Sequence, residues 1–449
     1  MKLAQLLLAS VATAAAVQAQ IRLPSLPLPG APLSSVPQSL SPVESGTLEH
    51  LSEVRRLNIR QLIRANRRTV DTDPNGEPIV RSEILALGAT DDALVQAESR
   101  GFVVDRQQSI AAADIRLLVL KAPVGLSTQK ALRGLRDADP KGLYDYNHIY
   151  SGGGAVWADP SPTEAQQNNP PIGLARPHIR IGLLDTGIDV THPVFRDSLL
   201  HTWGCGERRL PSAHGMAVAS LLVAHASADL YAADVYCDAP TGGAVDAIVA
   251  AFGWMAQEQV SVINVSLVGP KNILLERVVN ALLARGHVLV AAVGNDGPAA
   301  PPLYPAAYDG VVGVTAVDSR RRVLIEAERG PQVTFAALGA DIKAANLDHG
   351  YSEVRGTSFA APAVAALLAG PLSTPDKDAA RTVIAQLAKR AIDLGPPGKD
   401  FTYGFGLVGA EANQQSSWKK CSGPVVSRVE GRGMAAIKQE HDDESETDH

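Results

Sequence analysis

The sequence Gly356-Thr357-Ser358-Phe359-Ala360-Ala361-Pro362 opens an apolar run that continues to residue 369 and is closed by Gly370-Pro371. This pattern predicts a buried helix with Ser358 at its N-terminus. Unpaired N–H groups and the helix dipole favour negative charge there. A hydroxyl that attacks a carbonyl builds an oxyanion, so the position suits a nucleophile. Pro362 is expected in the first turn or just after it, where its missing N–H costs least. For a serine considered alone, an N-cap on a core helix is the simpler interpretation.

The composition sets the class of protein. The chain has 449 residues, of which 45% are apolar and 20% charged, which is enough for a large core and more than one domain. A net charge of −6 without an aromatic-rich basic block argues against a nucleic-acid partner. Residues 1–19 have a basic start, a short apolar stretch and small residues at the end, which predicts a cleaved secretory signal. No later run reaches about 18 uninterrupted apolar residues, so no transmembrane segment is expected. We therefore expect an exported protein: periplasmic, at the cell surface or extracellular.

Export makes the three cysteines interpretable, because oxidising compartments permit disulfides. Cys205 and Cys237 flank the His214 segment, and a bridge between them would contribute roughly 3–4 kcal/mol. Cys421 is then left as a free thiol or an intermolecular partner. The sequence favours the Cys205–Cys237 pairing without fixing it.

The chain divides into segments of different composition. Residues 20–47 are rich in proline and predict an extended linker. Residues 48–68 are basic and amphipathic and predict a helix, which either packs on the next unit or lies on a membrane surface. Residues 79–150 alternate as β-α-β-β-α-β, the plan of a small α+β ferredoxin-like domain, and a Ser-Gly-Gly-Gly boundary follows. Residues 416–449 predict a polar, disordered tail, with metal capture as the alternative.

From residue 178 onward, buried strands alternate with helices. Such alternation predicts βαβ units and a mostly parallel central sheet with helices on both faces. In sheets of this kind, active sites lie beyond the carboxyl ends of the strands. The polar residues at those ends are Asp185, His214, Ser266, Asn295 and Ser358. Each alone has a plain interpretation as a turn or cap residue. Together they place a carboxylate, an imidazole, an amide and a hydroxyl on one edge of the sheet.

Acyl transfer explains this set of groups. A serine at its ordinary pKa is a poor nucleophile and needs a base within hydrogen-bond reach, which His214 can supply. A carboxylate on the other ring nitrogen, here Asp185, fixes the tautomer and stabilises the imidazolium. Asn295 and the N–H of Ser358 can donate to the oxyanion. The chain contains neither His-Glu-x-x-His nor Gly-x-Ser-x-Gly, which weighs against zincin and α/β-hydrolase readings.

The order Asp185, His214, Asn295, Ser358, with the motifs Asp-Thr-Gly, His-Gly, Gly-Asn and Gly-Thr-Ser-Phe-Ala-Ala-Pro, resembles the subtilisin-like serine proteases, or subtilases. The resemblance covers about residues 170–415. It implies a subtilisin-like catalytic domain over 151–415 and a secreted serine endopeptidase that acts on polypeptides.

By the same resemblance, residues 48–150 correspond to a propeptide that chaperones and inhibits the enzyme. A self-processing cut is then expected at Tyr150–Ser151, within a few residues. The chemistry needs no cofactor, no metal ligands are recognisable, and structural calcium is left open.

The resemblance also implies the substrate-binding residues. One group matches the strand that pairs with substrate backbone: Ser266, Leu267, Val268 and Gly269. A second group matches the walls of the pocket for the side chain before the cut: Ala292, Val293, Gly294 and Leu303. Leu303 stands where the family often has a small residue, which predicts a shallow apolar pocket and conflicts with a tyrosine at the cut.

Two positions depart from the family pattern, and one rival function remains. Met216 stands where threonine is usual, and Val268 stands where glycine is common, which should narrow the groove. The rival is a binding or inhibitory module that no longer turns over substrate. The complete set of catalytic groups argues against the rival, and release of the 79–150 unit discriminates the two.

Overall fold

The structure is a computed structural model that describes residues 42–110, 115–152, 155–156, 178–206, 208–224, 227–237, 239 and 241–409. The predicted signal peptide, Cys421, the 416–449 tail and most of the 20–47 linker lie outside these residues. None of the described helices is both long and apolar enough to cross a membrane.

The larger unit is built on a seven-stranded sheet in the order β15-β14-β13-β11-β7-β9-β8, and every neighbouring pair is parallel. The strands are β7 (His178–Asp185), β8 (Leu199–Trp203), β9 (Ser227–Asp234), β11 (Val262–Val265), β13 (Val288–Ala292), β14 (Val312–Val317) and β15 (Val333–Leu338). Its central strands are buried on both faces, which explains their continuous apolar runs.

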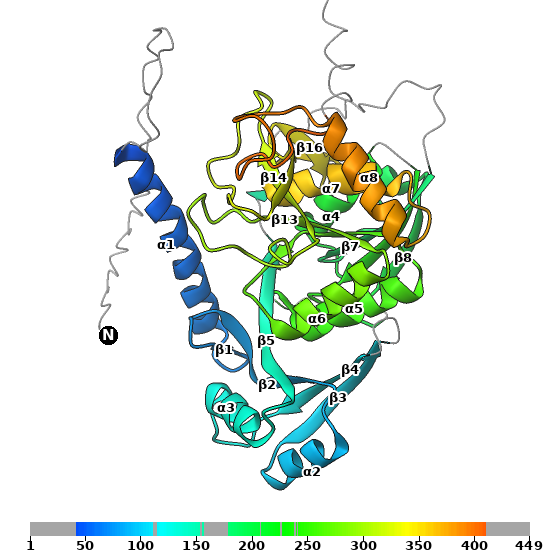
Figure 1. Cartoon of the computed structure of the whole chain (residues 1–449). Helices are drawn as coiled ribbons and strands as arrows, with labels where there is room; N and C mark the ends of the chain where they lie inside the picture. Colours follow the sequence, from blue (N-terminus) through cyan, green and yellow to red (C-terminus); the bar gives the residue numbers. More distant parts are fainter. Residues whose placement is uncertain are drawn as a thin grey trace, which may run out of the picture.

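Helices cover both faces of this sheet (Figure 1). Leu183 of β7 packs in the core cluster that contains residues of α4 (Ala213–Val223) and α7 (Thr357–Ala369). Its neighbour Leu184 packs in the cluster with α5 (Val245–Gln257) and α6 (Ile273–Ala284), because successive strand side chains face opposite ways. Helix α8 (Lys377–Arg390) contacts α7. The predicted mostly parallel sheet with helices on both faces is confirmed.

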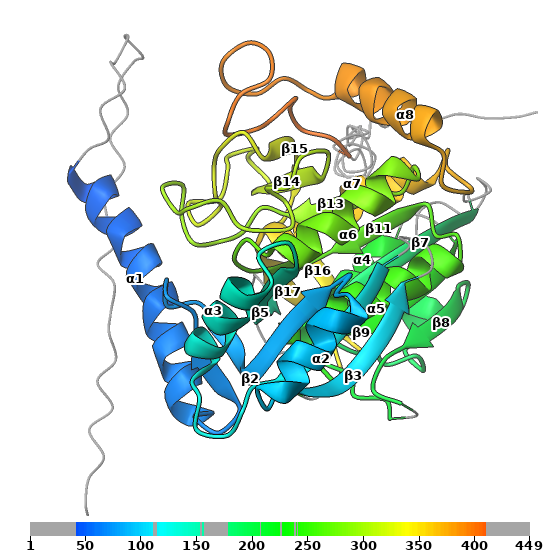
Figure 2. The same ribbon diagram turned by 60° about the horizontal axis from the view of Figure 1, so that its bottom comes forward.

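The smaller unit has the predicted β-α-β-β-α-β order. Its elements are β2 (Pro78–Leu87), α2 (Asp91–Ser99), β3 (Val103–Ile110), β4 (Ile115–Lys121), α3 (Thr128–Ala138) and β5 (Leu143–Gly152). The strands pair antiparallel in the order β5-β2-β4-β3, and the short strand β1 (Val70–Thr72) adds to β2. Helices α2 and α3 lie on the outer face of this sheet, whereas α5 and α6 of the larger unit contact the inner one (Figure 2).

Strand β5 belongs to both units. It continues past the small unit and pairs antiparallel with β10 (Gly243–Ala244) and with β12 (Leu267–Val268). The small sheet therefore extends through β5 into the larger unit, and Figure 1 shows this strand running from one unit to the other.

Some boundaries differ from the sequence prediction. Helix α1 runs over Pro42–Ala65, so residues 42–47 belong to this helix and not to the linker. A proline is well placed in a first helical turn, because its missing N–H is unpaired there anyway. The sequence analysis also missed β8, β15 and the hairpin of β16 (Ile342–Ala345) and β17 (Tyr351–Arg355), which pairs with β6 (Ala155–Val156). Strands β8 and β15 are the two edges of the sheet.

Candidate active site

Asp185 and His214 form a close pair at the carboxyl end of the sheet. Asp185 is the last residue of β7 and is fully buried, and His214 lies in the first turn of α4. The His214 Nδ1 atom lies 2.8 Å from Asp185 Oδ1 and 3.0 Å from Oδ2. Asp185 thus holds the ring through Nδ1. The other ring nitrogen, Nε2, has no hydrogen-bond partner among the described residues.

Two opposing effects act on the pKa of His214. Burial disfavours the charged imidazolium and by itself lowers this pKa. The charge of Asp185 and its hydrogen bond to the ring act in the opposite direction, and the net result is a raised pKa. The pair therefore favours the protonated ring, as a general base that must accept a proton requires.

Thr186 links the end of β7 to the first turn of α4, and the sequence analysis assigned no role to this residue of the Asp-Thr-Gly motif. Its backbone N–H donates to Asp185 Oδ1 at 2.7 Å, and its hydroxyl lies 3.1 Å from the same oxygen. The hydroxyl also accepts the backbone N–H of Gly215 at 2.9 Å, next to His214. A threonine directly after the strand-end aspartate was the available signal, since short hydroxyl side chains bond nearby backbone groups.

Ser358 is the second residue of α7 and is fully buried. The preceding Gly356 has φ +141°, a backbone conformation that side-chain-bearing residues rarely adopt. Pro362 lies inside the helix four residues after Ser358, so the Ser358 carbonyl loses its helical donor. The hydroxyl of Ser266 donates to that carbonyl at 3.1 Å. Ser266, which was predicted to belong to the strand that pairs with substrate backbone, therefore contacts the backbone of Ser358.

The imidazole and the serine hydroxyl come from neighbouring helices. Helices α4 and α7 contact each other, and the His214 ring lies 5.4 Å from the ring of Phe359, the residue after Ser358. The Ser358 hydroxyl donates to the Ser266 carbonyl at 3.4 Å. The structure thus brings the serine to the same edge as the Asp185–His214 pair, without a hydrogen bond from His214 Nε2.

Asn295 is oriented by the residue before the serine. Its side-chain oxygen accepts the N–H of Thr357 at 3.0 Å, and the Thr357 hydroxyl accepts the N–H of Gly294 at 3.3 Å. This leaves the Asn295 amide nitrogen buried and without a partner among the described residues. A buried, unpaired N–H donor beside the helix start suits the binding of an oxyanion.

The two predicted groups of substrate-binding residues lie on different segments. Leu267 and Val268 form β12 and pair with Gly152 and Ser151 of β5, and Gly269 follows directly. Ala292 ends β13, Val293 and Gly294 follow it, and all three are buried, as is Leu303.

The residues predicted to form the walls of a shallow apolar pocket have a carboxyl group beside them, because the fully buried Glu328 packs against Gly294 and Leu303. A Cβ atom on Gly294 would lie 2.5 Å from Glu328 Oε1 and 3.0 Å from Leu303 Cδ1. The N–H of Leu303 donates to the other carboxyl oxygen at 3.3 Å. Burial and the nearby charge of Asp296 raise the pKa of Glu328 to about 9, so the group is neutral near pH 7.

Cys205 and Cys237 are joined by a disulfide, with their Cα atoms 4.9 Å apart. Among the described residues, these cysteines and Asp234 are the one group whose side chains lie close enough to share a metal ion. Both sulfur atoms are held in the disulfide, and a thiolate is the form of cysteine that binds metals, so this group does not fit a metal site.

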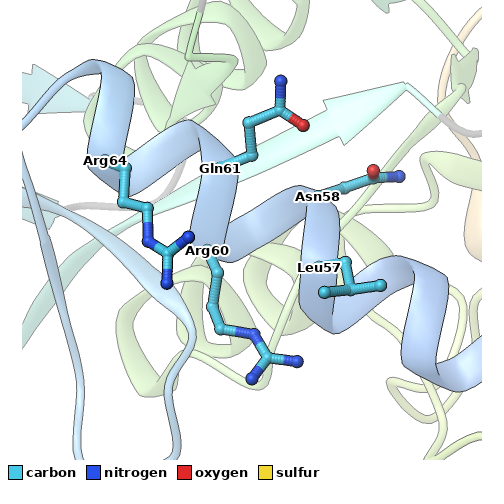
Figure 3. Close-up of a pocket in the computed structure, with 5 residues that line it drawn as sticks. All are labelled: Leu57, Asn58, Arg60, Gln61 and Arg64. Atoms are coloured by element: carbon cyan, nitrogen blue, oxygen red, sulfur yellow. The ribbon is translucent and has the colours of Figure 1, made fainter.

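A hollow of about 600 Å³ lies along α1, away from the strand ends. Figure 3 shows its lining side chains, all from this helix: Leu57, Asn58, Arg60, Gln61 and Arg64. None of these side chains is a nucleophile or a general base, so the hollow is not a candidate active site.

The carboxyl edge of the parallel sheet thus carries a buried aspartate–histidine pair, a serine at a helix start and an oriented amide. These are the groups that acyl transfer through a serine requires. The subtilase family model matches residues 177–406, just over half of the chain. The chain belongs to the subtilase family, and its class of enzyme is subtilisin-like serine endopeptidase.

Individual relatives agree with this assignment. Subtilisin DY of Bacillus licheniformis is 31% identical over 259 residues, which are 54% of this chain and 93% of that protein. The minor extracellular protease Epr of Bacillus subtilis (strain 168) is 28% identical over 278 residues, or 58% of this chain, and the match spans only 42% of Epr.

Among solved structures, fervidolysin from Fervidobacterium pennivorans, described as a keratinolytic enzyme related to subtilisin, has a similar fold. Its TM-score is 0.61 with 18% identity, and the match covers 77% of this chain and 62% of fervidolysin.

Proposed function

We propose that the protein is an exported serine endopeptidase, made as a precursor, that hydrolyses peptide bonds through an acyl-enzyme on Ser358. The observation that carries this proposal is the Asp185–His214 pair beside the start of α7, with a distance of 2.8 Å between carboxylate and ring nitrogen. Export is supported by the sequence of residues 1–19 and by the extracellular protease Epr among the relatives.

In the proposed reaction, the Ser358 hydroxyl attacks the peptide carbonyl while His214 Nε2 takes its proton. The imidazolium is stabilised by Asp185, and the oxyanion accepts hydrogen bonds from the Asn295 amide and the Ser358 N–H. The imidazolium then protonates the leaving amine, and the C–N bond breaks. Water, deprotonated by His214, attacks the ester in the same way and releases the acid and the serine hydroxyl.

We also propose that residues from α1 to β5 are a propeptide that the enzyme cuts itself. The path of β5 supports this, because the strand lies between β10 and β12 and ends beside His214, as a bound peptide would. The Gly152 N–H donates to the hydroxyl of Tyr236 at 2.6 Å. A Cβ atom on Gly152 would lie 3.1–3.3 Å from three atoms of the His214 ring.

The same path argues for a later cut than Tyr150–Ser151. The chain enters the site on β5, which ends at Gly152, and leaves it on β6, where Ala155 pairs with Arg355 just before Ser358. The cut is therefore proposed between Gly152 and Ala155. Because the residue before any bond in this interval is a glycine, the conflict between a tyrosine and a shallow pocket disappears.

An inhibitory and chaperone role of this segment is supported by an ion cluster between the two units, in which the carboxylates are buried and the arginine is partly exposed. Arg106 of β3 lies 2.7 Å from both Glu83 of β2 and Asp246 of α5. Asn147 of β5 donates to the same two carboxylates, at 2.7 and 2.8 Å. Buried carboxylates need such partners, and Asp246 of the larger unit takes them from Arg106 and Asn147 of the small unit. The small unit therefore completes the polar contacts of the larger one.

A fluorophosphonate serine probe together with casein hydrolysis tests the catalytic part of the proposal. We expect the wild type to be labelled and to cut casein, and Ser358→Ala to do neither. Ser319→Ala, which removes an exposed serine hydroxyl bonded to Asp341, is the matched control and should behave as the wild type. Labelling and hydrolysis that persist in Ser358→Ala would overturn the assignment of the nucleophile.

A further inference from the structure

The side chain of Tyr150 lies in a buried site of the larger unit. It is fully buried and belongs to the same apolar cluster as Ile248, Leu267 and Leu275. Its hydroxyl donates to the carbonyl of Pro270 at 2.5 Å. A buried hydroxyl needs such a partner, so the site accepts both the ring and the polar end of a tyrosine.

Two glycines of the larger unit make room for this residue. A Cβ atom on Gly269 would lie 2.7 Å from atoms of the Tyr150 ring, and one on Gly242 would lie 2.3 Å from the Tyr150 carbonyl oxygen. Gly242 also has φ +115°, which favours glycine independently. The ring therefore packs directly on the backbone of Gly269.

The two residues that follow Tyr150 in β5 differ in the size of side chain that their surroundings allow. Ser151 is exposed, so its side chain is under little constraint. Gly152 faces the His214 ring so closely that a larger side chain would push the ring away. On the wall expected beside the cut, Leu303 and Glu328 pack against Gly294, which leaves little room for a large side chain there.

We propose that the preferred substrates are extended, glycine-rich segments with the pattern Tyr-x-Gly, cut on the carboxyl side of that glycine and directly after a glycine. This inference rests on the proposed function, because it assumes that β5 binds as a substrate does. It follows from the tyrosine site at Gly269 and Pro270, the contact of Gly152 with His214, and the glycines that precede every bond from Gly152 to Ala155.

The test is a peptide panel on the wild-type enzyme. The parent peptide is Ile-Tyr-Ser-Gly-Gly-Gly-Ala-Val, the sequence of residues 149–156, with a fluorophore and a quencher at its ends. Replacing its tyrosine by alanine should lower kcat/KM roughly 10–100-fold through lost burial. Replacing the tyrosine by phenylalanine should cost about 2–10-fold through one hydrogen bond.

Two further changes in the peptide complete the panel. Replacing its first glycine by valine, or the glycine before the mapped cut by phenylalanine, should cost about tenfold or more, because overpacking a tight site is unfavourable. The matched control replaces serine by alanine and should change kcat/KM by no more than about threefold, as for other exposed positions.

A pair of enzyme variants tests the same site within the chain. Gly269→Val should stop cleavage between Gly152 and Ala155, and adding Tyr150→Ala should restore it, because the smaller side chain leaves room for the valine. If the second substitution restores cleavage, the loss in Gly269→Val is due to its clash with Tyr150 and not to a general structural defect. If the doubly substituted chain does not fold, the peptide panel on the wild type still decides.

The outcomes are distinguishable. If kcat/KM is the same for all peptides of the panel while casein is still cut in a Ser358-dependent way, the inference is overturned and the proposed function is left intact. Absence of any Ser358-dependent cleavage overturns the proposed function, and the inference fails with it.

Discussion

Arg55 Nε lies 2.8 Å from Asp296 Oδ2, so a cation of α1 contacts the residue that follows Asn295. The same guanidinium donates to both carboxyl oxygens of Glu77, at 2.8 and 2.9 Å. The first helix thus reaches across the small unit to the loop that carries the candidate oxyanion donor. Arg55 therefore faces acidic residues of the two units and not a membrane surface.

Removing that cation should loosen the loop after β13. In the Ser358→Ala chain, Arg55→Ala leaves Asp296 and Glu77 without their partner, so we expect faster hydrogen exchange over residues 294–300 and over α1. Arg60→Ala is the matched control, because among the described residues the ion-pair partner of Arg60 is Glu53 of the same helix. Equal exchange over 294–300 in both variants would contradict a specific contact.

Thr186 should act by positioning Asp185 and His214. Thr186→Val removes two hydroxyl hydrogen bonds, each worth about 1 kcal/mol, so we expect kcat to fall on the order of tenfold with KM little changed. Thr191→Val is the control, since its hydroxyl bonds only the exposed-loop Asp189 in the described structure. An unchanged kcat in Thr186→Val would remove the positioning role.

The activity should rise with pH above the ordinary titration range of histidine. The reaction needs neutral His214, and Asp185 raises the pKa of this ring, so the midpoint of the rising limb of kcat/KM should lie above about 6.5. Asp185→Asn should lower kcat by about 10⁴ and move the midpoint down, because the stabilising charge is lost. A wild-type midpoint at or below 6.5 would contradict this account.

Glu328 should make the fold less stable as pH rises. Its pKa is about 9 in the folded chain and about 4.5 when exposed, so between these values the folded state holds a proton that the unfolded state has lost. The free energy of unfolding therefore falls with rising pH across that window.

Glu328→Gln keeps the shape and removes this titration. In the Ser358→Ala chain, its Tm advantage should grow from pH 5 to pH 9, whereas Glu353→Gln, at an exposed position, should show no such trend. A parallel pH dependence of all three chains would show that Glu328 titrates normally.

The sequence was sufficient to predict the parallel sheet and its helices because the central strands and helices are buried and strongly apolar. It also placed Asp185, His214, Asn295 and Ser358 on one edge, since strand ends of a parallel sheet share an edge. The sequence could not predict contacts between distant segments. Ser266 with the Ser358 carbonyl, Glu328 with Gly294, and Arg55 with Asp296 each depend on tertiary packing that no local pattern encodes.

The position of the cut illustrates the same limit. The Ser-Gly-Gly-Gly boundary was visible in the sequence, but the expected Tyr150–Ser151 cut rested on spacing alone. The pairing of β5 with β10 and β12, and of β6 with β17, is what moves the proposed cut beyond Gly152.

The intact mass and N-terminal sequence of the secreted protein, wild type beside Ser358→Ala, test the central claim most directly. We predict a wild-type chain that begins at residue 153, 154 or 155, and a Ser358→Ala chain that keeps the whole segment from α1 to β5. An identical, uncut chain in both, or the same cut in both, would contradict self-processing through Ser358.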